Sequence, residues 1–200
     1  MINEEKNWFG VFRNNYIDNY IRLVIQSYNC IQTSSRKQIK KEEERRTELV
    51  DFMRQLKNEY HITFPITYES GINSKRMDIC CYLDGLTENF YICFECKRFL
   101  KTTTTKSNFY SEYYGEGIKR FENNEYSAHM SQAGMIAFLE SGDFDKLQKL
   151  MNKELPSNAV AMSVKDCSSE YGYNFVLKSA HNRVAKNGNI SLHHILMDLT

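Results

Sequence analysis

Three charged residues stand in two apolar segments of the chain, and their types and spacing suit metal-assisted hydrolysis. Asp78 lies in the segment 76–83, whereas Glu95 and Lys97 lie in the segment 90–99. Both segments are rich in Ile, Tyr, Phe and Cys, which is typical of strands. Charges in buried strands are costly unless they are paired or bind a metal. Because Glu95 and Lys97 are two residues apart, both side chains project from the same face of a strand.

The two segments are predicted to form a hairpin that brings the two carboxylates together. The connection 84–89 has the composition of a turn, and a turn centred between Leu86 and Thr87 pairs residues whose numbers sum to 173. Asp78 then lies directly opposite Glu95, with their Cβ atoms about 5 Å apart. A slip of one residue would remove this pairing. The same register gives three further opposed pairs: Cys80 with Cys93, Tyr82 with Tyr91, and Arg76 with Lys97.

Two carboxylates at that separation need a positive partner. They repel each other by about 3 kcal/mol at an effective dielectric constant near 20. Lys97 offsets part of this, but a divalent cation with oxygen ligands does so better, and Mg²⁺ takes one or two carboxylates together with waters and substrate phosphate. Such a cation polarises a phosphodiester and lowers the pKa of a bound water, while the lysine orients or deprotonates the nucleophile. The pattern therefore predicts phosphodiester hydrolysis with Mg²⁺, or with Mn²⁺ as an alternative cation.

The pattern of Asp78 followed by Glu-x-Lys at 95–97 resembles the motif of the PD-(D/E)xK nuclease superfamily, whose members have the restriction-endonuclease-like fold. That fold has a core of a helix, three strands, a helix and a further strand, and the order predicted for residues 37–139 is similar. Met77 stands where the family usually has a proline. The motif is short, so the resemblance rests on its strand context and spacing as well as on its letters.

The resemblance implies a role for each residue of the motif. Asp78 and Glu95 would hold the metal, the backbone carbonyl of Cys96 would join its ligand shell, and Lys97 would activate water. Family members often add a glutamate from the first helix of the core. This chain offers four glutamates there: Glu42, Glu43, Glu44 and Glu48.

Glu42 is the preferred helix glutamate. At 100° per residue it lies about 20° from Leu49, within the apolar stripe of the predicted helix, whereas Glu48 lies about 100° away. Glu44 and Glu48 remain alternatives because the first helical turn can be irregular. Solvated ion pairs with the neighbouring arginines are an equally good interpretation of any one of these glutamates.

Hydrophobic periodicity predicts the elements that must position these groups. Helices are expected at 8–28, from caps at Ser34 and Ser35 through about 58, at 110–121, at 128–140 and at 144–152. Strands are expected at 61–68, 76–83, 90–99, 159–164, 173–179 and 190–199. We expect one α/β (α+β) domain with a central mixed sheet flanked by helices. It divides into an N-terminal helical extension (1–34), a nuclease core (35–140) and a C-terminal helix and strands completing the sheet (141–200).

Composition narrows the class of protein. The 200 residues include 26 Lys and Arg against 25 Asp and Glu, so an anionic partner must meet a local patch rather than a basic surface. No apolar run is long enough to cross a bilayer and no signal peptide is evident, so we expect a soluble, cytoplasmic protein with reduced cysteines. Basic residues cluster on both sides of the candidate site and predict a rim that faces phosphates: Arg36, Lys37, Lys40, Lys41, Lys97, Arg98, Lys101 and Lys106.

The sequence therefore predicts a small Mg²⁺-dependent nuclease that acts on DNA, in restriction, defence or repair. Specificity would come from a homodimer or from a partner protein, because no separate recognition module is visible. One alternative is an inactive nuclease-like fold that binds nucleic acid or protein, and another is an RNA-cleaving nuclease. Gln132 is a further candidate, because the helix after the motif can supply a polar group in nuclease relatives. The tail histidines are given no role: His181, His193 and His194.

Overall fold

The computed structural model describes most of the chain. The described residues are 3–34, 40–72, 75–83, 91–157, 160–184 and 188–200. For residues 3–15, 69–72 and 75 the description covers the backbone alone.

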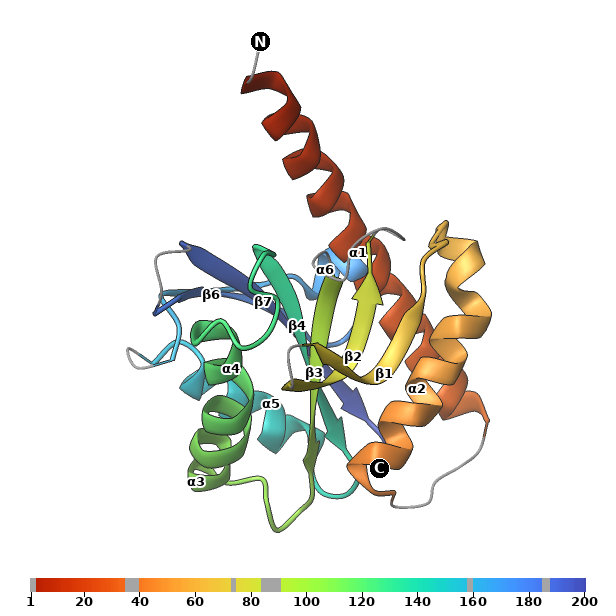
Figure 1. Ribbon diagram of the computed structural model, residues 1–200. Coiled ribbons are helices and arrows are strands. Elements are labelled where there is room, and N and C mark those ends of the chain that lie inside the picture. The colour runs from red at the N-terminus through yellow and green to blue at the C-terminus, as the bar shows by residue number, and fades with distance from the viewer. Residues whose placement is uncertain (1–2, 35–39, 73–74, 84–90, 158–159, 185–187) are drawn as a thin grey trace.

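The described chain alternates between helices and strands (Figure 1). The helical elements are α1 (Asn3–Thr33), α2 (Glu42–Leu56), η1 (Lys57–Tyr60), α3 (Lys106–Asn108), η2 (Phe109–Ile118), α4 (Lys119–Glu122), α5 (Phe144–Glu154) and α6 (Ser168–Tyr171). The strands are β1 (Ile66–Ile72), β2 (Lys75–Tyr82), β3 (Tyr91–Phe99), β4 (Gln132–Leu139), β5 (Ser163–Asp166), β6 (Val176–Asn182) and β7 (Asn189–Asp198).

The described strands form a seven-stranded mixed sheet in the order β1-β2-β3-β4-β7-β6-β5. β4 is central and pairs in parallel with β3 and with β7, whereas the other neighbouring strands are antiparallel. The strands of the C-terminal part therefore join the same sheet as the strands that carry the candidate motif.

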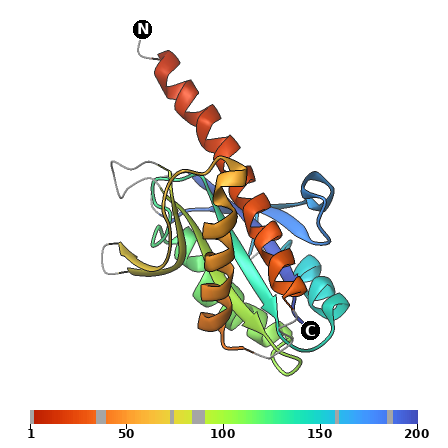
Figure 2. The same ribbon diagram turned by 90° about the vertical axis from the view of Figure 1, so that its right-hand side faces the viewer.

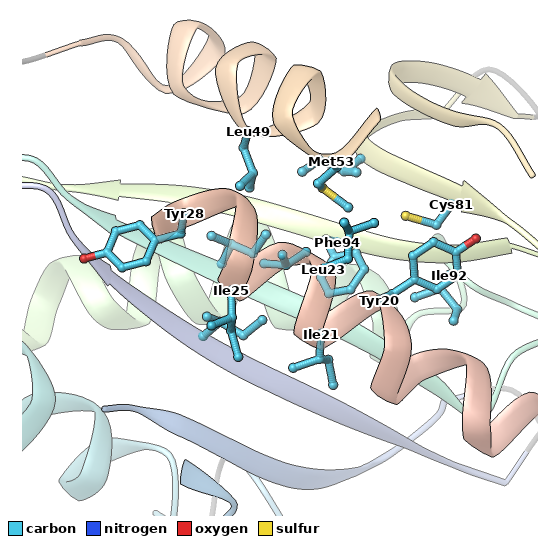
Figure 3. Packing of buried hydrophobic residues seen from close by; sticks show 14 of the residues in the cluster. Tyr20, Ile21, Leu23, Ile25, Tyr28, Leu49, Met53, Cys81, Ile92 and Phe94 are labelled. Carbon is cyan, nitrogen blue, oxygen red and sulfur yellow. The ribbon is translucent and has the colours of Figure 1, made fainter. Parts of the chain in front are cut away.

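Helices cover both faces of the sheet (Figures 1 and 2). One apolar core lies between the sheet and the helices α1 and α2, and Figure 3 shows Leu23, Met53 and Phe94 gathered in it. The second core lies on the opposite face, where residues of η2 and α5 such as Tyr113 and Met151 are buried. Fully burying one large apolar side chain contributes about 1.5–3 kcal/mol. The packing of Leu49 and Met53 therefore fixes α2, and with it the glutamates and arginines at its start.

The helix predicted over 128–140 is wrong, because this segment contains the central strand β4. Every residue from Ala133 to Glu140 is buried. A strand covered on both faces shows a continuous apolar run instead of alternation, and periodicity alone does not separate such a run from a buried helix. The strand needs Gly134, since a Cβ atom there would lie 2.1 Å from the Phe94 ring.

Two boundaries differ from the prediction near the candidate site. The helix α2 begins at Glu42 rather than near residue 36, and Ser34 caps the end of α1 by donating its hydroxyl to the Ile31 carbonyl at 2.9 Å. Ser35 lies outside the described residues. The strand β1 begins at Ile66, because the chain first forms the short helix η1 after α2.

The expected fold class is confirmed. A mixed central sheet with helices on both faces, and a core that runs from α2 through β1, β2 and β3 to β4, has the architecture of the restriction-endonuclease-like fold. In the described part of the chain, none of the helices combines the length and the apolar character that a membrane span requires.

Candidate active site

The strands β2 and β3 pair in the predicted register. The antiparallel pairs are Ile79–Phe94, Cys80–Cys93, Cys81–Ile92 and Tyr82–Tyr91. In each pair the residue numbers sum to 173, as the hairpin rule requires. The predicted turn centre at 86 and 87 lies outside the described residues. The register was thus predicted correctly from the composition of the connection and the spacing of the strands.

The ladder ends one step before the motif. Among the described residues, the predicted pairs Asp78–Glu95 and Arg76–Lys97 are not formed as backbone pairs. The Asp78 side chain reaches across instead, and its Oδ2 atom accepts a hydrogen bond from the Cys96 N–H at 2.8 Å. The two strands therefore separate where the charged residues lie, and a carboxylate occupies the gap.

Asp78 is also bound from the helical side. The Nη1 atom of Arg46, on α2, donates to the Asp78 Oδ1 atom at 2.5 Å. The Arg46 side chain is 6% exposed and the Asp78 side chain 16%. Both oxygens of this carboxylate therefore have protein donors. A charged pair this far from solvent is held by its geometry and its hydrogen bonds.

Glu95 and Lys97 lie on the same face of β3, as predicted, and form an ion pair. Lys97 Nζ is 2.9 Å from Glu95 Oε1, and their side chains are 14% and 2% exposed. Arg120 Nη1, on α4, lies 3.5 Å from the same oxygen. The other oxygen, Glu95 Oε2, is buried and has no hydrogen-bond partner among the described residues. An unpartnered buried carboxylate oxygen costs free energy.

The electrostatics of the pair follow from burial. Burial raises the pKa of Glu95 to about 7, and the charge of Asp78 adds to the rise, whereas Lys97 opposes it. Burial lowers the pKa of Lys97, but Glu95 and Glu42 outweigh this effect, so the net shift is upward. With its pKa raised in this way, Lys97 keeps its proton and acts as a hydrogen-bond donor.

Glu42, at the first position of α2, also lies at this cluster. Its Oε2 atom accepts a hydrogen bond from the Arg98 N–H at 2.8 Å. Burial raises the pKa of Glu42; the charge of Lys97 lowers it and that of Asp78 raises it. Glu42 therefore lies within electrostatic reach of the motif, although its catalytic role stays a prediction.

The alternative helix glutamates, Glu44 and Glu48, bind groups near the start of α2. Glu44 accepts a hydrogen bond from the Lys41 N–H and closes the start of α2. Glu48 pairs with Lys40 at 2.8 Å and with Arg45 at 3.0 Å. The described contacts thus direct both of these side chains away from the motif.

The segment after β3 approaches the site closely. A Cβ atom at Gly117, in the π-helix η2, would lie 3.5 Å from the Lys97 Cε atom. Arg120 follows one turn later and donates to the Tyr126 hydroxyl, which in turn donates to the Arg76 carbonyl at 2.6 Å. This chain of contacts aims a half-exposed guanidinium at Glu95. Short π-helical segments are common at functional sites.

The sequence analysis assigned no role at the site to Arg46 or Arg120. One interpretation of the helix glutamates paired them with solvated arginines, but Arg46 is 5% exposed and binds Asp78. The signal that was present is spacing, since Arg46 follows Glu42 by four residues and so faces the same way on a helix. Arg120 lies 3.5 Å from Glu95, and nothing in its local sequence shows that it reaches this acid.

Gln132 and the tail histidines have other positions in the fold. Gln132 begins β4 and pairs with Ser191, so the helical geometry on which its approach to the site rested is wrong. His181 and His194 belong to a buried hydrogen-bonded chain on the far half of the sheet, joined through Ser179 at 2.6 Å to each ring. Burial lowers the pKa of His194 well below its ordinary value.

The two basic segments meet beside the cluster. The Arg98 guanidinium donates to the Lys40 carbonyl at 2.9 Å, which joins the start of α2 to the end of β3. Lys101 and Lys106 are exposed further along. Arg36 and Lys37 lie outside the described residues. Part of the predicted basic rim therefore lies at the same end of the sheet as the motif.

The donor set fits a divalent cation such as Mg²⁺. Asp78 and Glu95 supply hard carboxylate oxygens, and Glu95 Oε2 is a buried acceptor without a partner among the described residues. Within the described part of the chain, no group of three or more His, Cys, Asp or Glu side chains is arranged to hold a metal ion. The side-chain ligands would therefore be these two carboxylates, with a backbone carbonyl and waters completing the shell.

The sheet and its flanking helices define a protein with the restriction-endonuclease-like fold, and the Asp and Glu-x-Lys cluster lies where two of its strands separate. The family described as type I restriction enzyme R protein N terminus matches residues 11–137, which is more than half of the chain, and the chain belongs to this family. The matched stretch contains Glu42, Asp78, Glu95 and Lys97. The comparisons with curated proteins and with solved structures gave no match.

Proposed function

We propose that this protein is a Mg²⁺-dependent nuclease of the PD-(D/E)xK superfamily that hydrolyses phosphodiester bonds in DNA as part of a restriction system. The observation that carries the proposal is the state of Glu95. It is an acid at 1% exposure, beside a second acid and a lysine, with one oxygen lacking a partner among the described residues. A cation shared by Asp78 and Glu95 would satisfy that oxygen and offset the repulsion between the two charges.

Each residue then has a defined task. Asp78, Glu95 and the Cys96 carbonyl would hold Mg²⁺, which supplies Lewis acidity toward a phosphodiester oxygen. Lys97 donates hydrogen bonds that orient the attacking water and neutralise charge on the phosphate. The charge of Glu95 raises the pKa of Lys97. A cation bound to Glu95 would weaken this effect, so the pKa of Lys97 would fall and Lys97 would become a better proton acceptor.

The charge distribution around the site supports an anionic polymer as substrate. The Arg120 guanidinium lies 3.5 Å from Glu95, and the Arg98 guanidinium donates to the Lys40 carbonyl at the start of α2. The outer face of α2 is acidic instead, with exposed side chains at Glu43, Glu44 and Asp51. A phosphate backbone would therefore approach from the side of Arg120 rather than across α2.

Sequence recognition by this chain alone has no support in the structure. The described elements all belong to the sheet and its covering helices, and none is a separate recognition module. The family takes its name from the N terminus of the R protein of a type I restriction enzyme. We therefore propose that a partner subunit, or a second copy of the chain, supplies specificity.

A cleavage assay tests the proposal. Supercoiled plasmid, single-stranded DNA and RNA are incubated with the wild type, Lys97→Ala and the control Lys149→Ala, with Mg²⁺, with Mn²⁺ and with a chelator. We expect the wild type and the control to nick DNA only with a cation, and Lys97→Ala to be slower by at least about 100-fold. Lys149 is a suitable control because it is exposed on α5, away from the motif.

Two results would redirect the proposal. Cleavage of RNA with intact DNA would favour the RNA-cleaving alternative. Absence of cleavage by every protein, with retained binding of DNA in a gel-shift assay, would favour a non-catalytic binding module. The contact of Arg46 with Asp78 gives this second alternative specific support, because it already neutralises one of the two acids.

A further inference from the structure

Arg46 occupies a place that the proposed function gives to a cation. Its guanidinium lies on α2, one helical turn after Glu42, and donates to the Asp78 Oδ1 atom at 2.5 Å. The pair is nearly removed from solvent. In this position a positive charge does for Asp78 what a metal ion would do, because it neutralises the carboxylate.

The other Asp78 oxygen also has a protein donor close to this pair. Oδ2 accepts the hydrogen bond from the Cys96 N–H at the point where β2 and β3 separate. A divalent cation at Asp78 would therefore lie beside the guanidinium, within a few ångströms of it. Two positive groups at that separation, away from water, repel strongly.

We infer that Arg46 is an internal competitor of the metal: it holds Asp78 in the metal-free protein and leaves that carboxylate when a divalent cation binds. The inference rests on the proposed function, because it needs a cation at Asp78 and Glu95. It adds that loading of the site requires the start of α2, or the Arg46 side chain alone, to change position.

Binding of Mn²⁺ tests this without any cleavage. The free Mn²⁺ signal in electron paramagnetic resonance gives the dissociation constant for the full chain and for four variants: Arg46→Met, Arg46→Lys, Arg54→Met and Asp78→Asn. Arg54 is the matched control, since it is an arginine of the same helix whose side chain is 42% exposed and which donates to the Ile66 carbonyl instead.

We expect Arg46→Met to bind Mn²⁺ at least about tenfold more tightly than the wild type, and Arg54→Met to bind as the wild type does. Arg46→Lys keeps the charge but replaces the planar fork by a compact ammonium, so a smaller gain is expected. Equal or weaker binding by Arg46→Met, together with lost binding by Asp78→Asn, would overturn the competition and leave the metal site standing. Wild-type binding by Asp78→Asn would instead overturn the metal site.

A measurement on the wild type alone covers the case in which Arg46→Met does not fold. The side-chain N–H signals of arginines in nuclear magnetic resonance report whether a guanidinium is held. We expect the Arg46 signals of the metal-free protein to be protected from exchange with water and to lose that protection at saturating Ca²⁺. Protection that persists at saturating Ca²⁺ would overturn the inference.

Discussion

Arg45 and Arg46 are neighbouring buried arginines of α2 that bind two different acids of the sheet, Glu140 and Asp78. The regions around these two acids differ in how completely the carboxylate oxygens are hydrogen-bonded. Glu140, just after β4, binds Arg45 through both oxygens, at 2.5 Å and 3.0 Å, and also accepts the Lys40 N–H at 3.0 Å. At the other region, Asp78 is shared between Arg46 and a strand N–H.

Glu95, the acid beside Asp78, differs most clearly from Glu140. Glu95 has an oxygen without a partner in the described part of the chain, whereas both oxygens of Glu140 are used. Among the described residues, other buried atoms also lack a hydrogen-bond partner, such as His193 Nδ1. Glu95 differs because its open atom lies next to a second acid and a lysine. A closed ion pair stabilises the fold, whereas an incomplete one is suited to receive a ligand.

The largest effect on stability is expected when the ion pair between Arg45 and Glu140 is broken. Arg45→Met leaves the Glu140 charge buried without its main partner, so the free energy of unfolding should fall by about 3–5 kcal/mol. Urea unfolding of the wild type and of the variant measures the loss. A free energy of unfolding within about 1 kcal/mol of the wild-type value would show that the Arg45–Glu140 pair does not stabilise the fold as described.

A smaller effect is expected at Glu95, and it depends on pH. Its pKa is raised to about 7 in the folded protein, above the ordinary glutamate value of 4.5. A raised acid pKa gives stability that is fully present below the unfolded value and is lost as pH rises through the folded one. Relative to the wild type, Glu95→Gln should therefore gain about 3 kcal/mol between pH 4.5 and pH 8 without metal.

Thermal and urea unfolding across that pH range, in the presence of a chelator, measure the gain. Glu112→Gln is the matched control, because Glu112 is exposed on η2 and lies outside the buried pair. A constant difference between Glu95→Gln and the wild type at all pH values would mean that Glu95 is not strained by burial beside Asp78.

The part of the site that depends on short-range rules was predictable. The turn chemistry and the period of two residues gave the register of β2 and β3 and placed Glu95 and Lys97 on one face. The helical wheel selected Glu42, whose carboxylate the structure places at Arg98. Each of these rests on geometry within one element or across one hairpin.

What depends on long-range packing was not predictable. The strand β4 shows no alternation of apolar and polar residues, because both of its faces are covered. For this reason a helix was wrongly predicted over 128–140. The exact end of the β2–β3 ladder depends on the Asp78 side chain, which takes the Cys96 N–H. Arg46 and Arg120 reach the acids only after α2 and α4 have packed on opposite faces of the sheet. The four-residue spacing from Glu42 gives the direction of Arg46 on its helix but not its partner.

The central claim is that Asp78 and Glu95 bind one divalent cation, and diffraction from Mn²⁺-soaked crystals tests it most directly. An anomalous difference peak is expected between the two carboxylates, about 2 Å from an oxygen of each, with the Arg46 guanidinium moved away from Asp78. A fully occupied Mn²⁺ site elsewhere, with Arg46 still bound to Asp78 and no peak beside Glu95, would contradict the account.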